Sequence, residues 1–218
     1  GIKVAVIFPR WMNRIPLLVG VGVPAGLVAI IGGMYYWFSP KYTDVGYTPD
    51  QPVAFSHKLH ASELGMDCRY CHNTVERAAK AAIPPTATCM NCHAIIGKEL
   101  KSLALVRESA ATGASIPWVR VHMLPDYAFF DHSVHLAAGV GCTSCHGRVD
   151  LMRTVGQQEP LSMSWCLECH RNPTPHLRPR QEVTNMAWDT TKAKYDAFAD
   201  ASRARQPNPP ISCSGCHR

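Results

Sequence analysis

The sequence has no cysteine outside one repeated five-residue unit, Cys-x-x-Cys-His, which occurs five times and uses all 10 cysteines. This absence argues against a disulfide framework, which would not repeat a single spacing five times. It also argues against zinc, because four-cysteine zinc sites use such pairs two by two, and five pairs leave one over. Neither alternative gives a reason for a histidine directly after every second cysteine.

The repeated unit is the attachment signature of a c-type haem. Its two thiols add to the two vinyl groups of the porphyrin as thioethers, and the adjacent histidine supplies one axial ligand to the iron. The sequence therefore predicts five covalently bound haems c as cofactors. The predicted attachment and proximal residues are Cys68, Cys71, His72, Cys89, Cys92, His93, Cys142, Cys145, His146, Cys166, Cys169, His170, Cys213, Cys216 and His217.

Regular helix and strand periodicity is also sparse, whereas proline (17) and glycine (15) are frequent. So little polypeptide for five haems cannot build a thick apolar core, and we expect the porphyrins to form much of it. The predicted fold class is mostly α with little regular structure: an N-terminal transmembrane helix and a multihaem cytochrome c domain. Haem propionates would offset the formal charge of +6, and no basic run is present, so we expect no nucleic-acid partner.

Charged side chains are absent from residues 15–38. As a helix these residues would span about 36 Å, enough for a bilayer core of about 30 Å. The aromatic residues Tyr35, Tyr36 and Trp37 close the segment as an interfacial belt. A buried soluble helix is rarely apolar all round for this length, and the apolar stretch of a cleaved signal peptide would be shorter. The segment is therefore predicted to cross the membrane.

The charges beside this segment predict its orientation. Lys3, Arg10 and Arg14 precede it, and only Lys41 follows closely. By the positive-inside rule the N-terminus is cytoplasmic. We therefore expect a single-pass protein of the inner (plasma) membrane, with residues 39–218 periplasmic or otherwise extracytoplasmic, the side on which c-type haems are generally attached.

An internal duplication organises the rest of the chain. The unit Phe-x-His-x-x-His begins at Phe55 and again at Phe130, and two haem motifs follow each copy. The predicted parts are the cytoplasmic N-terminus 1–14, the transmembrane helix 15–38, a tether 39–54, a first di-haem module 55–110, a connector 111–129, a second di-haem module 130–180, and a C-terminal helix with the fifth haem, 181–218.

The histidines of the duplicated units are candidate distal ligands. A low-spin electron-transfer haem needs a second strong axial ligand, usually His or Met. Residues three apart on a helical turn share a face but diverge toward different irons. The predicted distal ligands of four haems are His57, His60, His132 and His135. The candidates for the fifth haem are His176, then His122, Met163 and Met186.

Three further segments carry weaker patterns. Residues 98–111 have the spacing of a short amphipathic helix, residues 116–123 favour an extended stretch, and residues 190–206 favour a polar helix. The arginines of residues 171–180 are suited to pairing with haem propionates, and a solvated basic loop is the alternative.

Several of these features together resemble the multihaem cytochrome c family related to class III cytochromes. They are the single N-terminal membrane helix, the Phe-x-His-x-x-His unit, the run WVRVHMLPDYAFFDHSVHLAAGVGCTSCHG from Trp118, and PLSMSWCLECHRNP after it. Five haems with one anchor are most similar to the pentahaem cytochrome subunit of alternative complex III.

This resemblance implies an electron-carrier subunit, not an enzyme on its own, in a quinol-oxidising respiratory complex. It implies electron transfer to a periplasmic cytochrome c or another acceptor. It also implies partner subunits: an iron–sulfur protein, polytopic quinone-binding membrane proteins and a monohaem cytochrome c.

Two other function classes compete with this interpretation. A self-sufficient, membrane-anchored multihaem quinol dehydrogenase feeding a periplasmic reductase is the main alternative, but it would usually hold its first haem close to the membrane helix. A multihaem nitrite or sulfite reductase would need an iron with an open position and acid–base groups nearby. The chain has enough additional histidine and methionine to fill every sixth position, which disfavours the reductase.

Overall fold

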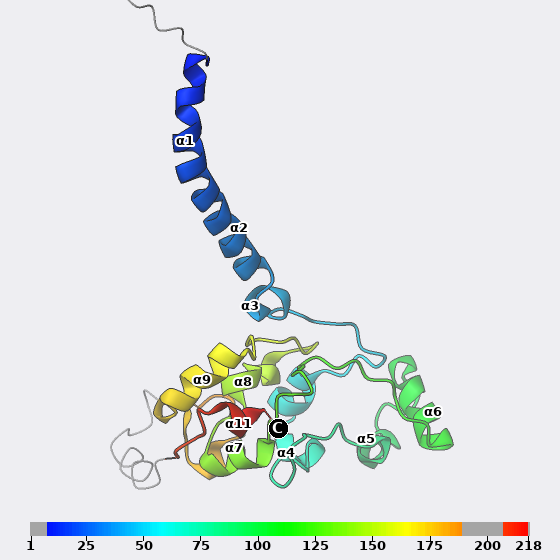
Figure 1. The fold of residues 1–218 in the computed structure, drawn as a ribbon. Coiled ribbons are helices and arrows are strands. Elements are labelled where there is room, and N and C mark those ends of the chain that lie inside the picture. Colours follow the sequence, from blue (N-terminus) through cyan, green and yellow to red (C-terminus); the bar gives the residue numbers. More distant parts are fainter. Residues whose placement is uncertain (1–7, 189–206, 218) are drawn as a thin grey trace, which may run out of the picture. The chain divides into compact units, whose positions relative to one another are not determined.

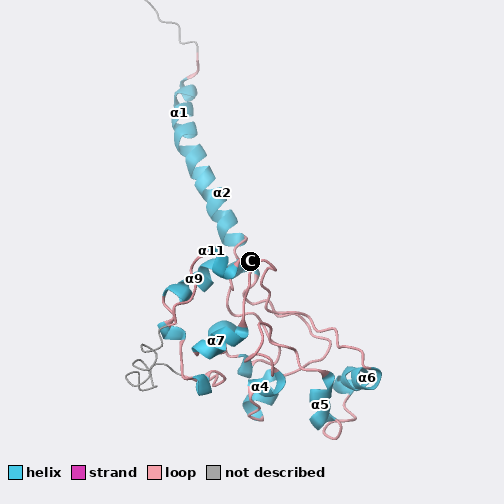
Figure 2. Ribbon diagram, turned by 60° about the horizontal axis from the view of Figure 1, so that its bottom comes forward, coloured by secondary structure: helices cyan, strands magenta, loops and turns pink. Residues whose placement is uncertain are grey.

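The computed structural model describes residues 8–188 and 207–217. Within these ranges the helices are short, long loops connect them, and no strand forms (Figure 2). One isolated antiparallel bridge joins Val140 and Leu177. The prediction of a mostly helical chain with little regular structure is confirmed for the described residues. The chain divides into a first unit, residues 1–43, and a second unit, residues 44–218, which are described separately.

The described part of the first unit is almost entirely helical (Figure 1). Its elements are a 3₁₀ turn Arg10–Arg14, α1 Ile15–Leu17, a π-helical turn Leu18–Gly22, α2 Val23–Trp37 and α3 Pro40–Thr43. The π-helical turn directly precedes α2 and Pro24, which has no N–H to donate. At the other end, the rings of Trp37 and Tyr42 pack edge to face with their centres 4.6 Å apart.

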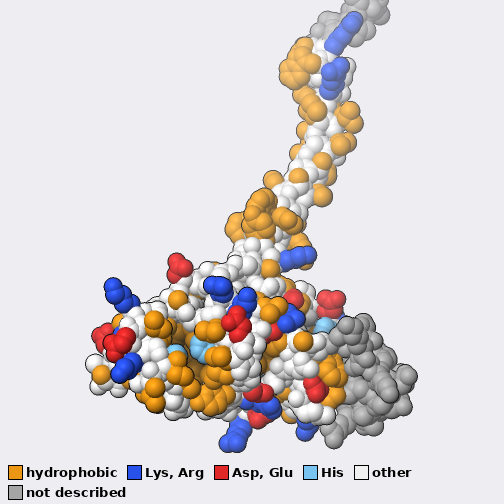
Figure 3. All heavy atoms as spheres, turned by 180° about the vertical axis from the view of Figure 1, so that it is seen from behind, with side chains coloured by type: hydrophobic (Ala, Val, Ile, Leu, Met, Phe, Trp, Pro, Cys, Tyr) orange, Lys and Arg blue, Asp and Glu red, His pale blue; other side chains and the backbone are white. Residues whose placement is uncertain are grey.

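The helical segment Arg10–Trp37 has the length and composition of a membrane span. It contains 28 residues, its most apolar window has a mean hydropathy of 2.2, and none of that window is buried. Figure 3 shows hydrophobic side chains on this helix and basic side chains near its start. A membrane anchor has these properties, and a signal sequence near an N-terminus passes the same test. The apolar helix is therefore confirmed, while its membrane role remains a prediction.

The second unit contains the cysteine motifs, and the two cysteines of each motif lie on a helix or, for Cys142, at its N-cap. Its elements are a π-helical turn Lys58–Glu63, α4 Cys68–Cys71, α5 Thr86–His93, a 3₁₀ turn Lys101–Leu103, α6 Ala104–Thr112, α7 His132–Ala138, α8 Thr143–His146, a 3₁₀ turn Val149–Leu151, α9 Met163–Arg171, 3₁₀ turns Thr174–His176 and Arg180–Glu182, and α11 Cys213–Cys216. Residues three apart on a helical turn lie on one side, so both thiols of each motif can face one porphyrin edge.

The polypeptide core of the second unit is small. The buried hydrophobic side chains among the described residues are Val53, Val106, Ile116, Leu177, Val183 and Met186. Three of them, Val53, Val106 and Ile116, form a cluster against which Trp118 packs. This agrees with the expectation that the polypeptide alone cannot supply a thick apolar core.

The weaker sequence predictions have mixed outcomes. The helix expected over 98–111 starts as a 3₁₀ turn and becomes α-helical only at Ala104, and Gly113 ends it in a left-handed conformation with φ of 75°. Left-handed φ at a helix end favours glycine because it has no Cβ. Residues 116–123 form no strand. The helix expected over 190–206 lies outside the described residues.

Candidate haem-binding site

The structure brings three histidines of the Phe-x-His-x-x-His units close to three motif histidines. In each case one ring comes from a duplicated unit and the other from a Cys-x-x-Cys-His motif. The separations between ring centres are 6.2 Å for His60 and His93, 6.4 Å for His132 and His146, and 6.2 Å for His135 and His170. These pairs join residues that the sequence predicted as distal and proximal ligands.

The separations fit a metal between two imidazoles. An imidazole nitrogen lies about 2.0–2.1 Å from a first-row metal that it ligates, and the ring centre lies roughly 1.1 Å behind that nitrogen. Two rings on opposite sides of one ion therefore have centres about 6.3 Å apart. All three pairs match this value, so the residues fit a bis-histidine haem.

Backbone carbonyls orient most of these rings. An Nδ1–H that donates to a carbonyl fixes the tautomer and leaves Nε2 unprotonated for a metal. Seven histidines have such an Nδ1 contact, at 2.7–3.0 Å. The contacts are His60 to Ser56, His72 to Ala82, His93 to Ile96, His132 to Ala79, His135 to Asp131, His170 to Pro210 and His217 to Tyr127.

A phenylalanine ring supports each duplicated pair of histidines. Phe55 meets His57 edge to face, with ring centres 4.9 Å apart, and stacks on His60 at 4.4 Å. Phe130 repeats this arrangement with the first histidine of its own unit at 4.7 Å and with the second at 4.5 Å. The duplication seen in the sequence is therefore also a duplication of geometry, and it explains the phenylalanine of the repeated unit.

Burial keeps the central histidines neutral. Burial lowers the pKa of His57 to about 4, with a smaller contribution from the neighbouring His72. Burial likewise lowers the pKa of His146 to about 3, with His122 adding to the effect. Neutral imidazole is the form that ligates a metal. The Nδ1 atom of His57 is buried and has no hydrogen-bond partner among the described residues.

The candidates for the fifth distal ligand occupy different environments. His122 places its Nε2 atom 3.3 Å from Nδ1 of His146, which is behind that ring and not across from its Nε2. Met186 belongs to the buried hydrophobic set, whereas Met163 is 64% exposed at the start of α9. His176 ends a 3₁₀ turn and is half-buried. The ring of His217 lies 5.8 Å from the ring of Tyr127, and no described contact pairs it with one of the four candidates.

A buried arginine lies beside the third motif. Arg178 is 7% exposed and donates from Nη2 to Oγ1 of Thr143 at 2.8 Å and from Nη1 to the carbonyl of Asn185 at 3.0 Å. A Cβ on Gly141 would collide with the guanidinium, so this position favours glycine. Burial lowers the pKa of Arg178. The sequence grouped this residue with other arginines for propionate pairing and gave no signal of its burial.

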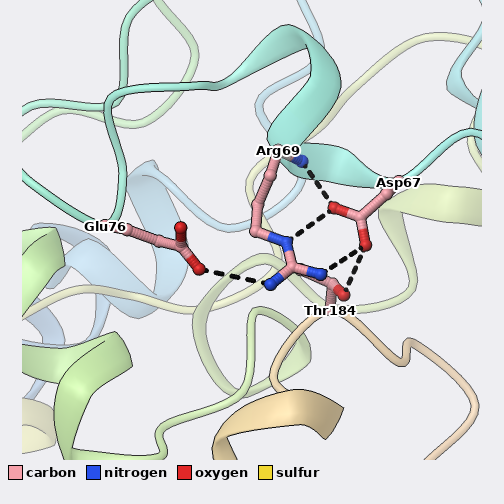
Figure 4. Close-up of polar contacts among 4 residues, drawn as sticks. All are labelled: Asp67, Arg69, Glu76 and Thr184. Carbon is pink, nitrogen blue, oxygen red and sulfur yellow. Dashed lines mark hydrogen bonds and ion pairs between the residues drawn. The ribbon is translucent and has the colours of Figure 1, made fainter.

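A polar cluster supports the first motif (Figure 4). Asp67 caps α4 by accepting from the backbone N–H of Arg69, and its carboxylate also pairs with that guanidinium at 2.9 Å. Arg69 reaches Glu76 at 3.2 Å, and Oγ1 of Thr184 donates to Asp67 at 3.0 Å. Hydrogen bonds from Arg69 lower the pKa of Asp67 to about 2. Sequence analysis missed this role, although an aspartate directly before a helical motif is a recognisable N-cap signal.

The histidine-bearing surface is partly open. Figure 3 shows histidine side chains at the surface of the second unit among hydrophobic side chains. Cys92 and Cys213 are exposed, and the other eight motif cysteines are half-buried. The arrangement therefore presents paired imidazoles and adjacent thiols among hydrophobic side chains, which suits a porphyrin bound through thioethers and two nitrogens.

Comparisons with known proteins agree with this chemistry. The sequence matches the class III cytochrome c family over residues 39–114 and 119–218. It is also similar to a protein of Nitratidesulfovibrio vulgaris strain Hildenborough that is named menaquinone reductase, multiheme cytochrome c subunit. The two are 32% identical over 132 residues, which cover 60% of this chain. The match spans 58% of the length of that curated relative, which is less than two thirds.

Proposed function

This chain belongs to the class III cytochrome c family, and we propose that it transfers electrons through five covalently attached haems c as the anchored subunit of a membrane respiratory complex. The family implies c-type haems and electron transfer. The number of haems, their ligands and the complex are our proposals. The observation that carries them is the set of three histidine pairs with ring centres 6.2–6.4 Å apart.

The five motifs would hold the haems through their paired cysteines, and the motif histidines would be proximal ligands. We assign His57 to the haem of His72 by analogy with the second module, where the first histidine of the unit, His132, faces the histidine of the next motif, His146. His60, His132 and His135 are the distal partners of His93, His146 and His170. Each bound haem supplies a one-electron Fe(III)/Fe(II) couple. The chain's own contribution would be to orient the imidazole rings as ligands and, at His57, His135 and His146, to lower the pKa by burial so that the ring stays neutral.

Paired histidines favour a carrier over a catalyst. An iron with two imidazoles has no open position for a substrate, and a rigidly held ligand pair needs little rearrangement when the electron arrives. Quinol oxidation also requires a pocket with a proton acceptor. The helical segment Arg10–Trp37 has no charged side chain after Arg14, so it offers no such group by itself. The quinone site would therefore be formed by other membrane subunits.

We infer that the complex exchanges electrons with a quinone pool. Quinol oxidation in a complex of the alternative complex III type fits five haems and one anchor. Its partners would be an iron–sulfur protein, polytopic quinone-binding proteins and a monohaem cytochrome c. The name of the Nitratidesulfovibrio relative supports a second candidate, a complex that reduces menaquinone. Two additions to the purified complex distinguish the candidates. Rapid reduction of the haems by a menaquinol analogue supports oxidation of quinol. Rapid reoxidation of pre-reduced haems by a menaquinone analogue supports the second candidate.

The proposed topology has a cytoplasmic N-terminus and residues 39–218 outside the inner membrane. It is supported by the apolar helix Arg10–Trp37 and by Arg10 and Arg14 at its start. Protease added to spheroplasts should digest the haem domain. Protection of that domain would contradict the orientation, and a mature chain that lacks the apolar helix would identify it as a signal sequence.

The haem assignment is tested by mass and by spectroscopy. The denatured protein should carry the mass of five haems and no free thiol in any motif. Replacing His60, His132 or His135 by alanine should each convert one low-spin haem to a high-spin form. Lys58→Ala, on the same turn as His60, is the matched control and should leave all haems low-spin. Unchanged low-spin spectra in the three histidine variants would remove the ligand assignment.

The carrier role is tested with the isolated, fully haem-loaded subunit. Reduction by a quinol analogue should be slow compared with the intact complex and insensitive to quinone-site inhibitors. Rapid, inhibitor-sensitive reduction of the isolated subunit would instead favour a self-sufficient quinol dehydrogenase that feeds a periplasmic reductase.

A further inference from the structure

The contacts between motifs allow the haems to be placed in a spatial order. We number the haems by their motifs, from haem 1 at His72 to haem 5 at His217; this step rests on the haem assignment proposed above. The order in space need not follow the order in sequence. The spatial order follows from the contacts that join one haem motif, or its distal histidine, to another motif.

Haems 1 and 2 are neighbours. Their distal ligands, His57 and His60, are three residues apart around one turn, and one phenylalanine ring contacts both. The motifs themselves also touch, because Nδ2 of Asn91 in motif 2 donates to the Tyr70 hydroxyl of motif 1 at 3.0 Å. Two irons that are bound by histidines of one turn cannot be far apart, so haems 1 and 2 are adjacent.

Haems 3 and 4 are linked in the same way. His132 and His135 lie on the first turn of α7, and the ring of Phe130 contacts both. The thiols of Cys145 in motif 3 and Cys169 in motif 4 are close enough for their charges to interact. The second module therefore repeats the link of the first.

The connection between the modules joins haem 1 to haem 3. Cys68 of motif 1 lies near Cys142 of motif 3. The distal ligand of haem 3, His132, donates from both its backbone N–H and Nδ1 to the carbonyl of Ala79, which follows motif 1. The segment 183–184 reinforces this junction, because the backbone N–H of Cys142 in motif 3 donates to the carbonyl of Val183 at 3.0 Å and Thr184 donates to Asp67, directly before motif 1 (Figure 4).

Haem 5 attaches beside haem 4. The motif-4 histidine, His170, donates from Nδ1 to the carbonyl of Pro210 at 2.7 Å, three residues before motif 5. The thiols of Cys166 and Cys216 are close enough for their charges to interact. Helices α9 and α11 lie side by side in Figures 1 and 2, whereas α5, which carries motif 2, lies toward the opposite side of the unit beyond α4.

From these links we propose that the five haems form one unbranched chain in the order 2–1–3–4–5. Haem 2 and haem 5 are then the two ends, and haem 1 is an interior member although its motif comes first in the sequence. Exposure supports the same ends independently, because Cys92 of motif 2 and Cys213 of motif 5 are the two exposed motif cysteines. Electrons enter through one of these haems and leave through the other.

The order predicts how many neighbours each haem has, and this number can be counted. A methionine in place of a distal histidine raises the potential of that haem, so it can be reduced selectively in the holoprotein. Reduction to a diamagnetic Fe(II) haem removes its magnetic coupling to adjacent ferric haems and changes their electron paramagnetic resonance signals. In His60→Met, one other signal should change, because haem 2 is an end. In the matched variant His57→Met, two signals should change, because haem 1 is interior.

Two or more changed signals in His60→Met, or only one in His57→Met, would overturn the order. If a variant fails to retain its haems, the iron positions of the wild-type holoprotein decide the same question. Haem 2 should then have haem 1 as its nearest neighbour, and haem 1 should lie between haems 2 and 3; any other neighbour for haem 2 overturns the order. Failure of the ligand assignment is distinguishable, because neither variant would then shift the potential of any haem.

Discussion

The two proposed di-haem modules have the same ring geometry around their histidines but differ in what orients these rings. In the first module, residues 55–110, the Nδ1 atoms of His60, His72 and His93 meet carbonyls only 3–10 residues away in the chain. In the second module, residues 130–180, His135 keeps a local partner four residues away, whereas the Nδ1 partner of His132 is 53 residues distant.

The other two rings of the second module also depend on distant residues. The partner of His146 is His122, 24 residues away in the connector, and the partner of His170 is Pro210, 40 residues away. The Nδ1 contacts of His60, His72 and His93 in the first module are therefore local, whereas three of those in the second module reach the first module, the connector or the C-terminal segment. The two copies share the proposed histidine ligands and the phenylalanine, but not the source of the ring orientation.

Among the tests of this difference, removal of the C-terminal haem should have the largest effect. In a Cys213→Ala, Cys216→Ala variant the covalent haem count should fall from five to four, and the signal of haem 4 should shift because Pro210 loses its anchored neighbour. The haems of the first module should keep their spectra. Denatured mass and electron paramagnetic resonance measure both effects. The counterpart variant, Cys89→Ala with Cys92→Ala, should leave the spectra of haems 3 and 4 unchanged. If either variant changed the spectra of both modules equally, the histidines of the first module would not be oriented locally.

The second test addresses what the modules share. Phe55→Ala and Phe130→Ala each remove a half-buried ring that packs on two histidines, and each should lower the free energy of unfolding by about 2–3 kcal/mol, somewhat less than for a fully buried ring. Denaturant unfolding of the holoproteins measures the loss. Because the ring geometries agree within 0.2 Å, the two losses should be similar. A loss confined to one module would show that the phenylalanines have different roles.

A third test targets a contact of the second module alone. If His146 ligates through Nε2, its Nδ1 carries the proton and donates to His122. That hydrogen bond makes the ligand more electron-rich and stabilises Fe(III). His122→Phe should therefore raise the potential of haem 3 by roughly 50 mV, close to a tenfold change in equilibrium constant for one electron. Redox titration measures the shift, and His122→Gln, which keeps an acceptor, should restore most of it. An unchanged potential in both variants would remove the proposed contact.

The smallest expected effect concerns the polar junction at Asp67. Its pKa is depressed to about 2 by the hydrogen bonds from Arg69, so its contribution is present above about pH 4 and is lost as the pH falls toward 2. The side chain is 42% exposed, and solvent screening limits the contribution to about 1 kcal/mol. Asp67→Ala should show this loss in denaturant unfolding at pH 7 and none near pH 2. Asp67→Asn keeps the cap and isolates the charge; a pH-independent loss in Asp67→Ala would exclude the ionised carboxylate as the cause.

Sequence patterns predicted the parts of this protein that repeat or that depend on composition. The apolar helix, the mostly helical character with little regular structure of the described residues, and the near approach of His60, His132 and His135 to motif histidines all follow from such patterns. The Nδ1 partners did not, because every residue has a carbonyl and only the folded chain shows that those of Ala79 and Pro210 are the ones within reach.

Other features depend on packing that no local pattern encodes. Met186, one of the candidate ligands, belongs to the buried hydrophobic set, and the sequence did not indicate this burial. The amphipathic spacing over 98–111 was recognisable, yet its first turn is 3₁₀ and the α-helix begins at Ala104. The identity of the fifth distal ligand stays a prediction, since it depends on how a single unrepeated segment meets His217.

The reach of His170 to Pro210 has a consequence for biogenesis. If residues 39–218 are exported as proposed, they emerge outside the membrane in sequence order, and the first motifs are available for haem attachment before the last. The carbonyl partners of His60, His72 and His93 would then be present as soon as the first module has emerged. The ring of His170, at haem 4, gains its carbonyl partner only when Pro210, 40 residues downstream, has also emerged. We therefore expect haems 1 and 2 to reach their final ligation first in pulse-labelled maturation intermediates. Haem 4 should reach it only after the C-terminal segment has crossed the membrane.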